Sequence, residues 1–196
     1  MTSRPALLVL DLLNEIVHPD GKYAAHGYAR EVAERDVLGR AATAIDRARM
    51  SGVPVIYVVV GFSLDYAEWP PRSPVFAEAR AEEKLVIGHW GTQVHDAVKP
   101  ADGEQIVVKR RISPFFGTEL DLVLRTRGVD SLLLAGVSTD LVVLATARDG
   151  HDRDYQVTVL ADATASADRT LHEAALAVIA RTATVTTVDE AMPRLR

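Results

Sequence analysis

Residues 131–150 read SLLLAGVSTDLVVLATARDG, and this stretch decides the fold class. Its first part, SLLLAG, is a continuous apolar run typical of a strand buried on both faces. The remainder, TDLVVLATARDG (139–150), has the apolar spacing of a helix that Gly150 closes. Such a strand–turn–helix corner is where many α/β enzymes place a nucleophile. Here the corner offers Val142 and Val143, and the chain contains no cysteine.

The rest of the chain repeats this alternation of strand and helix. Apolar runs such as VPVIYVVV (53–60) are uninterrupted, which is typical of a parallel sheet covered on both faces. The pattern predicts a doubly wound α/β fold. No repeat, low-complexity tract or linker divides the sequence, so we expect one domain over residues 1–196. Further strands are expected at 6–13, 104–109, 155–163 and within 183–192, and helices at 29–51, 92–100, 118–128 and 167–182.

Composition excludes several classes of function. The net charge is −5 and the lysines and arginines are scattered, which argues against nucleic acid as a partner. No apolar run reaches the ~20 residues that a membrane-spanning helix needs. The first residues, MTSRPALLVLDLL, lack the layout of a signal peptide, so we expect a cytoplasmic protein. Without cysteine, this chain can form no disulfide, thiolate metal site or thiol nucleophile.

Polar residues follow several predicted strands at their carboxyl ends, where ligands bind in open α/β sheets. Asp11 ends the first strand, Lys109 ends the third, and Ser138 and Thr139 follow the fourth. A carboxyl group beside an ammonium group can move protons near neutral pH. Each residue also has a structural interpretation: Asp11 can cap a turn, Lys109 can be solvated, and Ser138 and Thr139 can cap the next helix. Together they indicate a site.

Three segments resemble the isochorismatase-like hydrolases, a superfamily that includes cysteine amidohydrolases such as nicotinamidases and N-carbamoylsarcosine amidases. They are LLVLDLLNEI (7–16), the run from VVKRRISPFFG to LATARDG (107–150), and YQVTVLADATA (155–165). The resemblance covers nearly the whole chain and keeps the order of the motifs. It implies a six-stranded, mostly parallel sheet with helices on both faces.

The resemblance also implies catalytic positions. Asp11 and Lys109 match two members of the family's Asp–Lys–Cys triad, and the position of the third falls on Val142. In the thiol enzymes a cysteine there attacks an amide carbon while the aspartate accepts its proton. Valine has no lone pair to offer and no proton to transfer. Acyl transfer through a thioester is therefore excluded for this chain.

Family members without the cysteine hydrolyse a vinyl ether, in which the aspartate is proposed to protonate the vinyl carbon. The resemblance thus implies a thiol-independent hydrolase that uses Asp11 and Lys109 in acid–base catalysis. An apolar Val142 would help to keep Asp11 protonated by desolvation. The resemblance further implies a non-proline cis peptide at Val137–Ser138, whose amides would form an oxyanion hole.

Aromatic and basic residues are candidates for binding the substrate. The long loop GFSLDYAEWPPRSP (61–74) supplies Phe62, Tyr66 and Arg72, and Phe115 follows Lys109. Aromatic rings with an arginine suit a small cyclic or carboxylated molecule. Phe115 has an alternative role in the core or at a subunit interface.

No cofactor is expected, because the sequence has neither a Walker loop nor a GxGxxG motif. The six histidines show no metal-ligand spacing, so no metal is expected either. The family resemblance implies a homodimer or a higher homo-oligomer. The missing nucleophile leaves one alternative to an enzyme: a non-catalytic protein that binds a small molecule or serves in an assembly, derived from a cysteine hydrolase.

Overall fold

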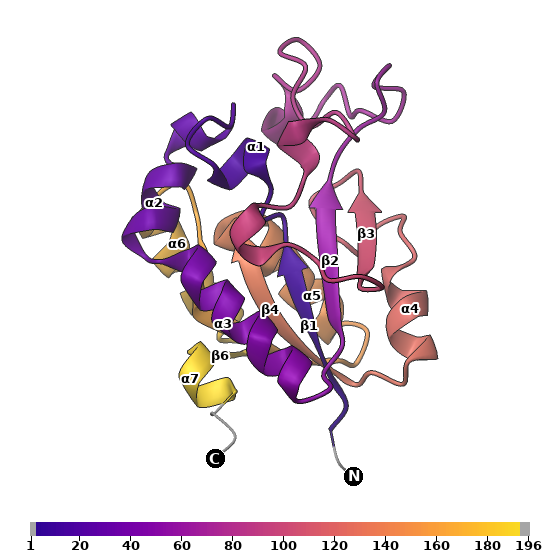
Figure 1. Cartoon of the computed structure of the whole chain (residues 1–196), viewed down its shortest axis with the longest axis vertical. Helices are drawn as coiled ribbons and strands as arrows, with labels where there is room; N and C mark the ends of the chain where they lie inside the picture. The colour runs from indigo at the N-terminus through magenta and orange to yellow at the C-terminus, as the bar shows by residue number, and fades with distance from the viewer. Residues whose placement is uncertain (1–2, 193–196) are drawn as a thin grey trace.

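The computed structural model describes residues 3–192, in which six strands form one sheet in the order β3-β2-β1-β4-β5-β6 (Figure 1). All the pairings between these strands are parallel, which confirms the predicted α/β fold. An isolated antiparallel bridge joins Leu13 to Val94 outside the sheet. The strands are β1 (Pro5–Leu10), β2 (Val55–Val60), β3 (Gln105–Lys109), β4 (Ser131–Val137), β5 (Gln156–Ala165) and β6 (Thr184–Thr186).

The strand order reverses at β1, which pairs with β2 on one side and with β4 on the other. A crevice opens beyond the carboxyl ends of the strands at such a switch point. Leu10 and Gly136 are direct partners there. Gly136 has a φ of 129°, and a Cβ at this position would collide with the Leu10 carbonyl group. Glycine therefore lets β1 and β4 stay close where the site begins.

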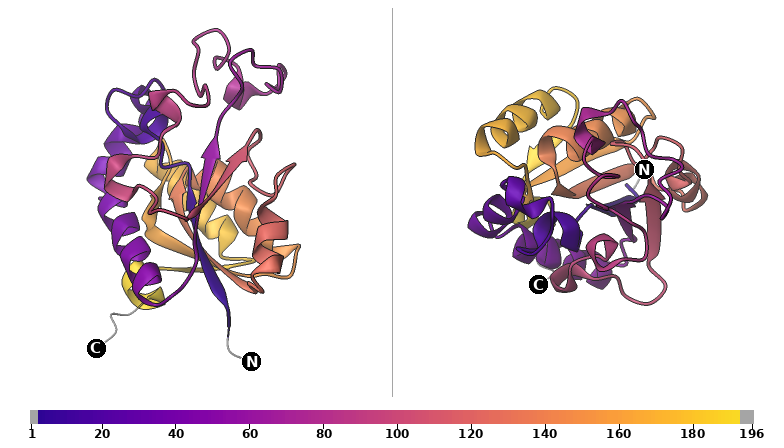
Figure 2. Two further views of the ribbon diagram at one scale, coloured as in Figure 1. Left: turned by 45° about the vertical axis from the view of Figure 1, so that its right-hand side comes forward. Right: turned by 90° about the horizontal axis from the view of Figure 1, so that it is seen from above.

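Two layers of helices cover the sheet (Figure 2). Alternation along β1 directs Leu7 and Val9 into the core under α3, whereas Leu8 and Leu10 enter the core under α4, α5 and α6. None of the helices in residues 3–192 is long and apolar enough to cross a bilayer. The helices are α1 (Asn14–Val17), α2 (Tyr28–Glu34), α3 (Val37–Met50), α4 (Leu120–Thr126), α5 (Leu144–His151), α6 (Arg169–Ile179) and α7 (Val188–Ala191).

Two helix predictions were wrong in detail. The helix expected at 29–51 is two helices, because Asp36 adopts a left-handed φ of 52° between α2 and α3. The helix expected at 92–100 is only two 3-10 turns, Trp90–Thr92 and Asp96–Val98. Between these turns the chain is extended, and Val94 bridges to Leu13. Tertiary pairing thus overrides the local helical pattern.

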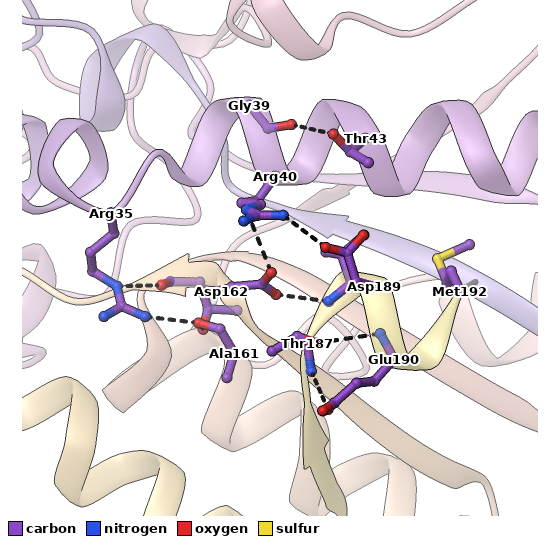
Figure 3. Close-up of polar contacts among 12 residues, drawn as sticks. Arg35, Gly39, Arg40, Thr43, Ala161, Asp162, Thr187, Asp189, Glu190 and Met192 are labelled. Atoms are coloured by element: carbon purple, nitrogen blue, oxygen red, sulfur yellow. Dashed lines mark hydrogen bonds and ion pairs between the residues drawn. The ribbon is translucent and has the colours of Figure 1, made fainter. Parts of the chain in front are cut away.

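The C-terminal helix α7 is attached to α3 and β5 by polar contacts (Figure 3). The Asp162 carboxylate accepts a hydrogen bond from the Val188 amide at 2.9 Å and lies 3.7 Å from the Arg40 guanidinium group. Thr187 and Glu190 form a capping box at the start of α7. Helix α7 directly follows β6, so this network lies at the β6 edge of the sheet (Figure 1).

Candidate functional site

Asp11 is the first residue after β1, and its side chain is almost fully buried, with 2% exposed. The backbone turns here with a φ of 50°, a left-handed conformation that aspartate tolerates better than most residues. The Asp11 amide donates to the Val58 carbonyl at 2.9 Å, and its Oδ1 accepts from the Val60 amide at 2.8 Å. Both neighbours belong to β2, so the adjacent strand fixes the carboxyl group.

Lys109 ends β3 and completes a buried ion pair. Its Nζ lies 2.8 Å from Asp11 Oδ2 and donates to the Arg111 carbonyl at 3.0 Å, and only 1% of the side chain is exposed. Parallel pairing places Lys109 opposite Val60, which brings it to the same edge as Asp11. Burial raises the pKa of Asp11, and the charge and hydrogen bond of Lys109 oppose that rise. The net direction is upward, so the pKa of Asp11 lies above the usual range of a carboxyl group, which suits a proton donor.

The corner after β4 forms the next part of the site. The peptide bond between Val137 and Ser138 is cis, as the resemblance predicted. The helix then begins with a π-helical turn, Thr139–Val143, on which Val142 lies, and continues as α5. Such π-turns occur frequently at functional sites.

A buried histidine supports this corner from α6. His172 Nδ1 lies 2.8 Å from the Thr139 hydroxyl group, and both residues are buried. Burial, followed by the charge of Arg35, lowers the pKa of His172 to about 4. The imidazole is therefore neutral at pH 7, and we assign it a role in positioning the turn.

Asp11, Lys109 and the corner open into one pocket with an empty volume of about 480 Å³, part of which is open to solvent. Most of its wall is apolar, which strengthens electrostatic interactions at the ion pair. The segment between β2 and β3 (61–104), whose first part lies above β2 in Figure 1, contributes three of the lining residues, Val75, Phe76 and Leu85. The other lining residues are Asp11, Ile16, Tyr23, Tyr28, Val60, Lys109, Ile112, Val137, Ser138, Leu141 and Val142.

Five of the residues selected from the sequence thus lie around one pocket, although they come from β1, β3 and the corner after β4. The four candidates for binding the substrate lie elsewhere. Phe62 and Tyr66 pack with Phe76 in the core under the long loop. Tyr66 also donates its hydroxyl hydrogen to the Lys84 carbonyl at 2.7 Å. The five predicted residues that do line the pocket are Asp11, Lys109, Val137, Ser138 and Val142.

The remaining two candidates are also outside the pocket lining. Phe115 is buried in the core beneath α4 and α5, where it stacks on Tyr155 with the ring centroids 6.1 Å apart. This position agrees with the alternative core role for Phe115. Arg72 is exposed on the long loop. The sequence indicated that this loop lies near the site, but local pattern could not show which of its side chains face inward.

Tyr23 and Tyr28 bring hydroxyl groups to the pocket, and neither residue was predicted from the sequence. Both belong to the segment between β1 and α3, which starts at the carboxyl end of β1. This position in the chain could have predicted them, because a segment that begins at the carboxyl end of β1 starts beside the expected ligand site. Ile16 and Phe76 were missed as well, and as single apolar residues they carry no distinguishing pattern.

Within residues 3–192, no three metal-ligating side chains come together in a group that could hold a metal ion. Comparisons with known proteins identify the family of this chain. The family model described as "Isochorismatase domain" matches residues 5–190. The chain therefore belongs to the isochorismatase family of hydrolases.

Individual relatives are similar over most of their length. The ureidoacrylate amidohydrolase RutB of Methylobacterium radiotolerans is 36% identical over 186 residues, a match that covers 88% of this chain and 72% of that protein. The crystal structure of N-carbamoylsarcosine amidase from Thermoplasma acidophilum superimposes with a TM-score of 0.74 at 32% identity, covering 95% of this chain and 97% of that one. A cysteine hydrolase from Pseudomonas syringae pv. phaseolicola gives a TM-score of 0.87 at 27% identity, with coverages of 96% and 91%.

Proposed function

We propose that this protein is a thiol-independent hydrolase of a small molecule, in which Asp11 and Lys109 carry out acid–base catalysis. The observation that supports it most is the buried ion pair, 2.8 Å between Lys109 Nζ and Asp11 Oδ2, at the wall of an apolar pocket. Buried charges are costly to hold unless they are paired, and this pair opens toward space for a ligand. Val142 lies at the same wall, and it supplies no nucleophile.

Vinyl-ether hydrolysis is the reaction that needs only these groups. The Asp11 carboxylic acid transfers its proton to the terminal vinyl carbon, and the ether oxygen and its neighbouring carbon become an oxocarbenium ion. Lys109 stabilises the Asp11 carboxylate that forms. Water adds to the cationic carbon while its proton returns to Asp11. The resulting hemiketal collapses to a carbonyl compound and an alcohol. Together these two products contain the atoms of the substrate and one water molecule.

The names of the relatives support a second type of bond. RutB and the N-carbamoylsarcosine amidase are amide-type hydrolases by name. With Asp11 ionised, its carboxylate could take a proton from water for attack on an amide carbon, without a covalent intermediate. The raised pKa of Asp11 favours the acid role, so we place vinyl-ether hydrolysis first.

A non-catalytic role is the alternative, and the observation that favours it is Val142 at the nucleophile position. In that case the pocket would hold a small molecule without turnover, or the chain would serve in an assembly. We also propose a homodimer or higher homo-oligomer, supported by large apolar side chains on the surface such as Phe116 and Leu122, which are 65% and 69% exposed. Light scattering at several protein concentrations would test it.

The enzyme is tested by screening turnover of small vinyl ethers, amides and carbamoyl compounds by mass spectrometry, with Asp11→Asn beside the wild type. Asparagine keeps an oxygen for the Val60 amide but cannot exchange a proton. We expect roughly a 100-fold loss of turnover or more in this variant, with an unchanged circular dichroism spectrum. Arg40→Met, far from the pocket, should turn over like the wild type.

The result identifies the mechanism or rejects it. Turnover of a vinyl ether that disappears in Asp11→Asn supports the acid role. Turnover of an amide supports activated water instead. Turnover that survives Asp11→Asn would refute the proposed catalytic pair. If no compound in the panel reacts but some bind, the non-catalytic alternative is favoured.

A further inference from the structure

We propose that the pocket selects an uncharged substrate, a compact molecule with one polar end that the hydroxyl groups of Tyr28, Ser138 and Tyr23 recognise. This deepens the proposed function and rests on it, because it takes the pocket as the substrate site. It is tested by binding alone, so that it can fail or succeed whatever the outcome of the turnover screen.

Two of these hydroxyl groups have no partner within the described residues. Ser138 is 5% exposed and its Oγ is buried without a hydrogen bond, and the same is true of the Tyr23 hydroxyl oxygen. A buried polar atom without a partner is costly, which points to a bound group that completes it. Both residues line the pocket.

Tyr28 is the third hydroxyl-bearing residue of the wall and lies close to the corner. Burial raises the pKa of Tyr28. Burial likewise raises the pKa of Tyr23 to about 12. All three hydroxyl groups are therefore neutral at physiological pH, and each can donate one hydrogen bond and accept others. Such groups complement a carbonyl, amide or hydroxyl group.

The pocket wall offers no spare cation, among residues 3–192, to neutralise a substrate carboxylate. Lys109 is the only lysine or arginine of these residues in the lining, and it is already paired with Asp11 at 2.8 Å. When Asp11 is ionised, a substrate carboxylate would have to displace it from this contact. Leaving the Asp11 carboxylate buried and unpaired is unfavourable.

The basic side chains nearest to the pocket in the chain are held elsewhere. Arg110 Nε lies 2.6 Å from the Glu68 carboxylate, and Arg111 donates to the Glu68 and Arg110 carbonyls at 2.9 and 2.7 Å. Lys84 lies 2.8 Å from Glu78 and 2.9 Å from Glu82. With Arg72 exposed outside the lining, the expectation of a carboxylated substrate loses its basis.

The proposal is tested with three probes that share a branched carbon skeleton and differ in charge: isobutyramide, isobutyrate and isobutylamine. Binding is followed by protein-observed NMR at pH 7.5, where the last two are ionised. We expect isobutyramide to shift the amide signals of Ser138 and Val142, and the charged probes to bind roughly tenfold more weakly or worse.

Three hydroxyl deletions test the recognition residues. Ser138→Ala, Tyr28→Phe and Tyr23→Phe should each weaken isobutyramide binding by roughly two- to tenfold, as expected for one lost hydrogen bond. Tyr155→Phe is the matched control, because its hydroxyl group contacts Asp121 at 2.9 Å outside the pocket. This control should bind like the wild type.

Either of two results would overturn the assignment. One is isobutyrate or isobutylamine binding in the pocket as tightly as isobutyramide. The other is isobutyramide binding that is undetectable or that does not respond to any of the three deletions. Spectra of each variant without probe show whether the fold is intact, so that loss of binding is not confused with unfolding.

Discussion

Two clusters in this protein pair acidic with basic side chains for different purposes. At the carboxyl ends of the strands, Asp11 and Lys109 form a pair with 2% and 1% of their side chains exposed. At the β6 edge of the sheet, Arg40 and Arg47 of α3 hold α7 through Asp189, whose side chain is 60% exposed (Figure 3 shows Arg40 and Asp189). The first cluster lines a pocket, and the second attaches a helix to the rest of the fold.

The difference lies in how each cluster completes its hydrogen bonds. Arg47 donates to the Val188 and Met192 carbonyls and to Asp189, so the protein itself satisfies the buried guanidinium group. Beside the Asp11–Lys109 pair, Ser138 Oγ has no partner within the described residues. An ion pair by itself does not distinguish a functional site from a structural one, and here the unpartnered Ser138 hydroxyl group and the adjoining pocket add that distinction.

The largest effect is expected from breaking the buried pair on one side. Lys109→Met leaves the Asp11 carboxyl group buried without its counter-charge and should lower the free energy of unfolding by about 3–5 kcal/mol, as measured by urea denaturation at pH 7. The double variant Asp11→Asn/Lys109→Met removes both charges and should recover most of that loss. A loss below about 1 kcal/mol in Lys109→Met would show that the pair is solvated.

The structural cluster should respond next. Arg47→Met removes hydrogen bonds to two carbonyl groups and to Asp189 at 2.6 Å, and should cost about 2–3 kcal/mol of stability. Probe binding in the pocket should not change, because α7 is remote from it. A change in isobutyramide affinity as large as that caused by Ser138→Ala would contradict the separation of the two regions.

Acid should destabilise the site corner through His172. Its pKa falls from 6.5 in the unfolded chain to about 4 in the folded protein, so the unfolded state binds more protons between these values. The stabilisation is therefore complete above pH 6.5 and is lost as pH falls toward 4, by about 1–2 kcal/mol after solvent screening. Urea denaturation at several pH values, with His172→Gln as the non-titrating control, measures it. A flat profile shared by both proteins would refute the assignment.

The smallest effect is expected at the exposed edge of the structural cluster. Arg40 lies 3.3 Å from Asp189 and 3.7 Å from Asp162, but its side chain is 42% exposed. Arg40→Met should change stability by less than about 0.5 kcal/mol, and added salt should reduce the difference further. Thermal unfolding of both proteins at low and high salt provides the measurement. If Arg40→Met lowered the free energy of unfolding as much as Arg47→Met, the exposure of the two arginines would not explain their contributions to stability.

The strands could be predicted from sequence because their information is local. Short, uninterrupted apolar runs rich in β-branched residues, such as 53–60, indicate buried parallel strands, and the residues that end those runs then fall at one edge. That rule is sufficient to place Asp11 and Lys109 at a common edge. The helices were less predictable, since Asp36 breaks the 29–51 segment by its backbone conformation, which the side-chain pattern does not encode.

The fold class, the juxtaposition of Asp11 and Lys109 and the absence of cysteine all follow from the sequence, because strand ends and residue identity require no knowledge of distant contacts. The choice of side chains that form the pocket depends instead on tertiary packing. Tyr23 and Tyr28 reach it from the segment between β1 and α3, and Phe76 reaches it from the segment between β2 and β3, whereas Arg72 of the latter segment stays exposed. The direction of such a side chain follows from tertiary packing, such as the contact between the Phe62 and Phe76 rings, whose centroids lie 5.4 Å apart, and no periodic pattern records it.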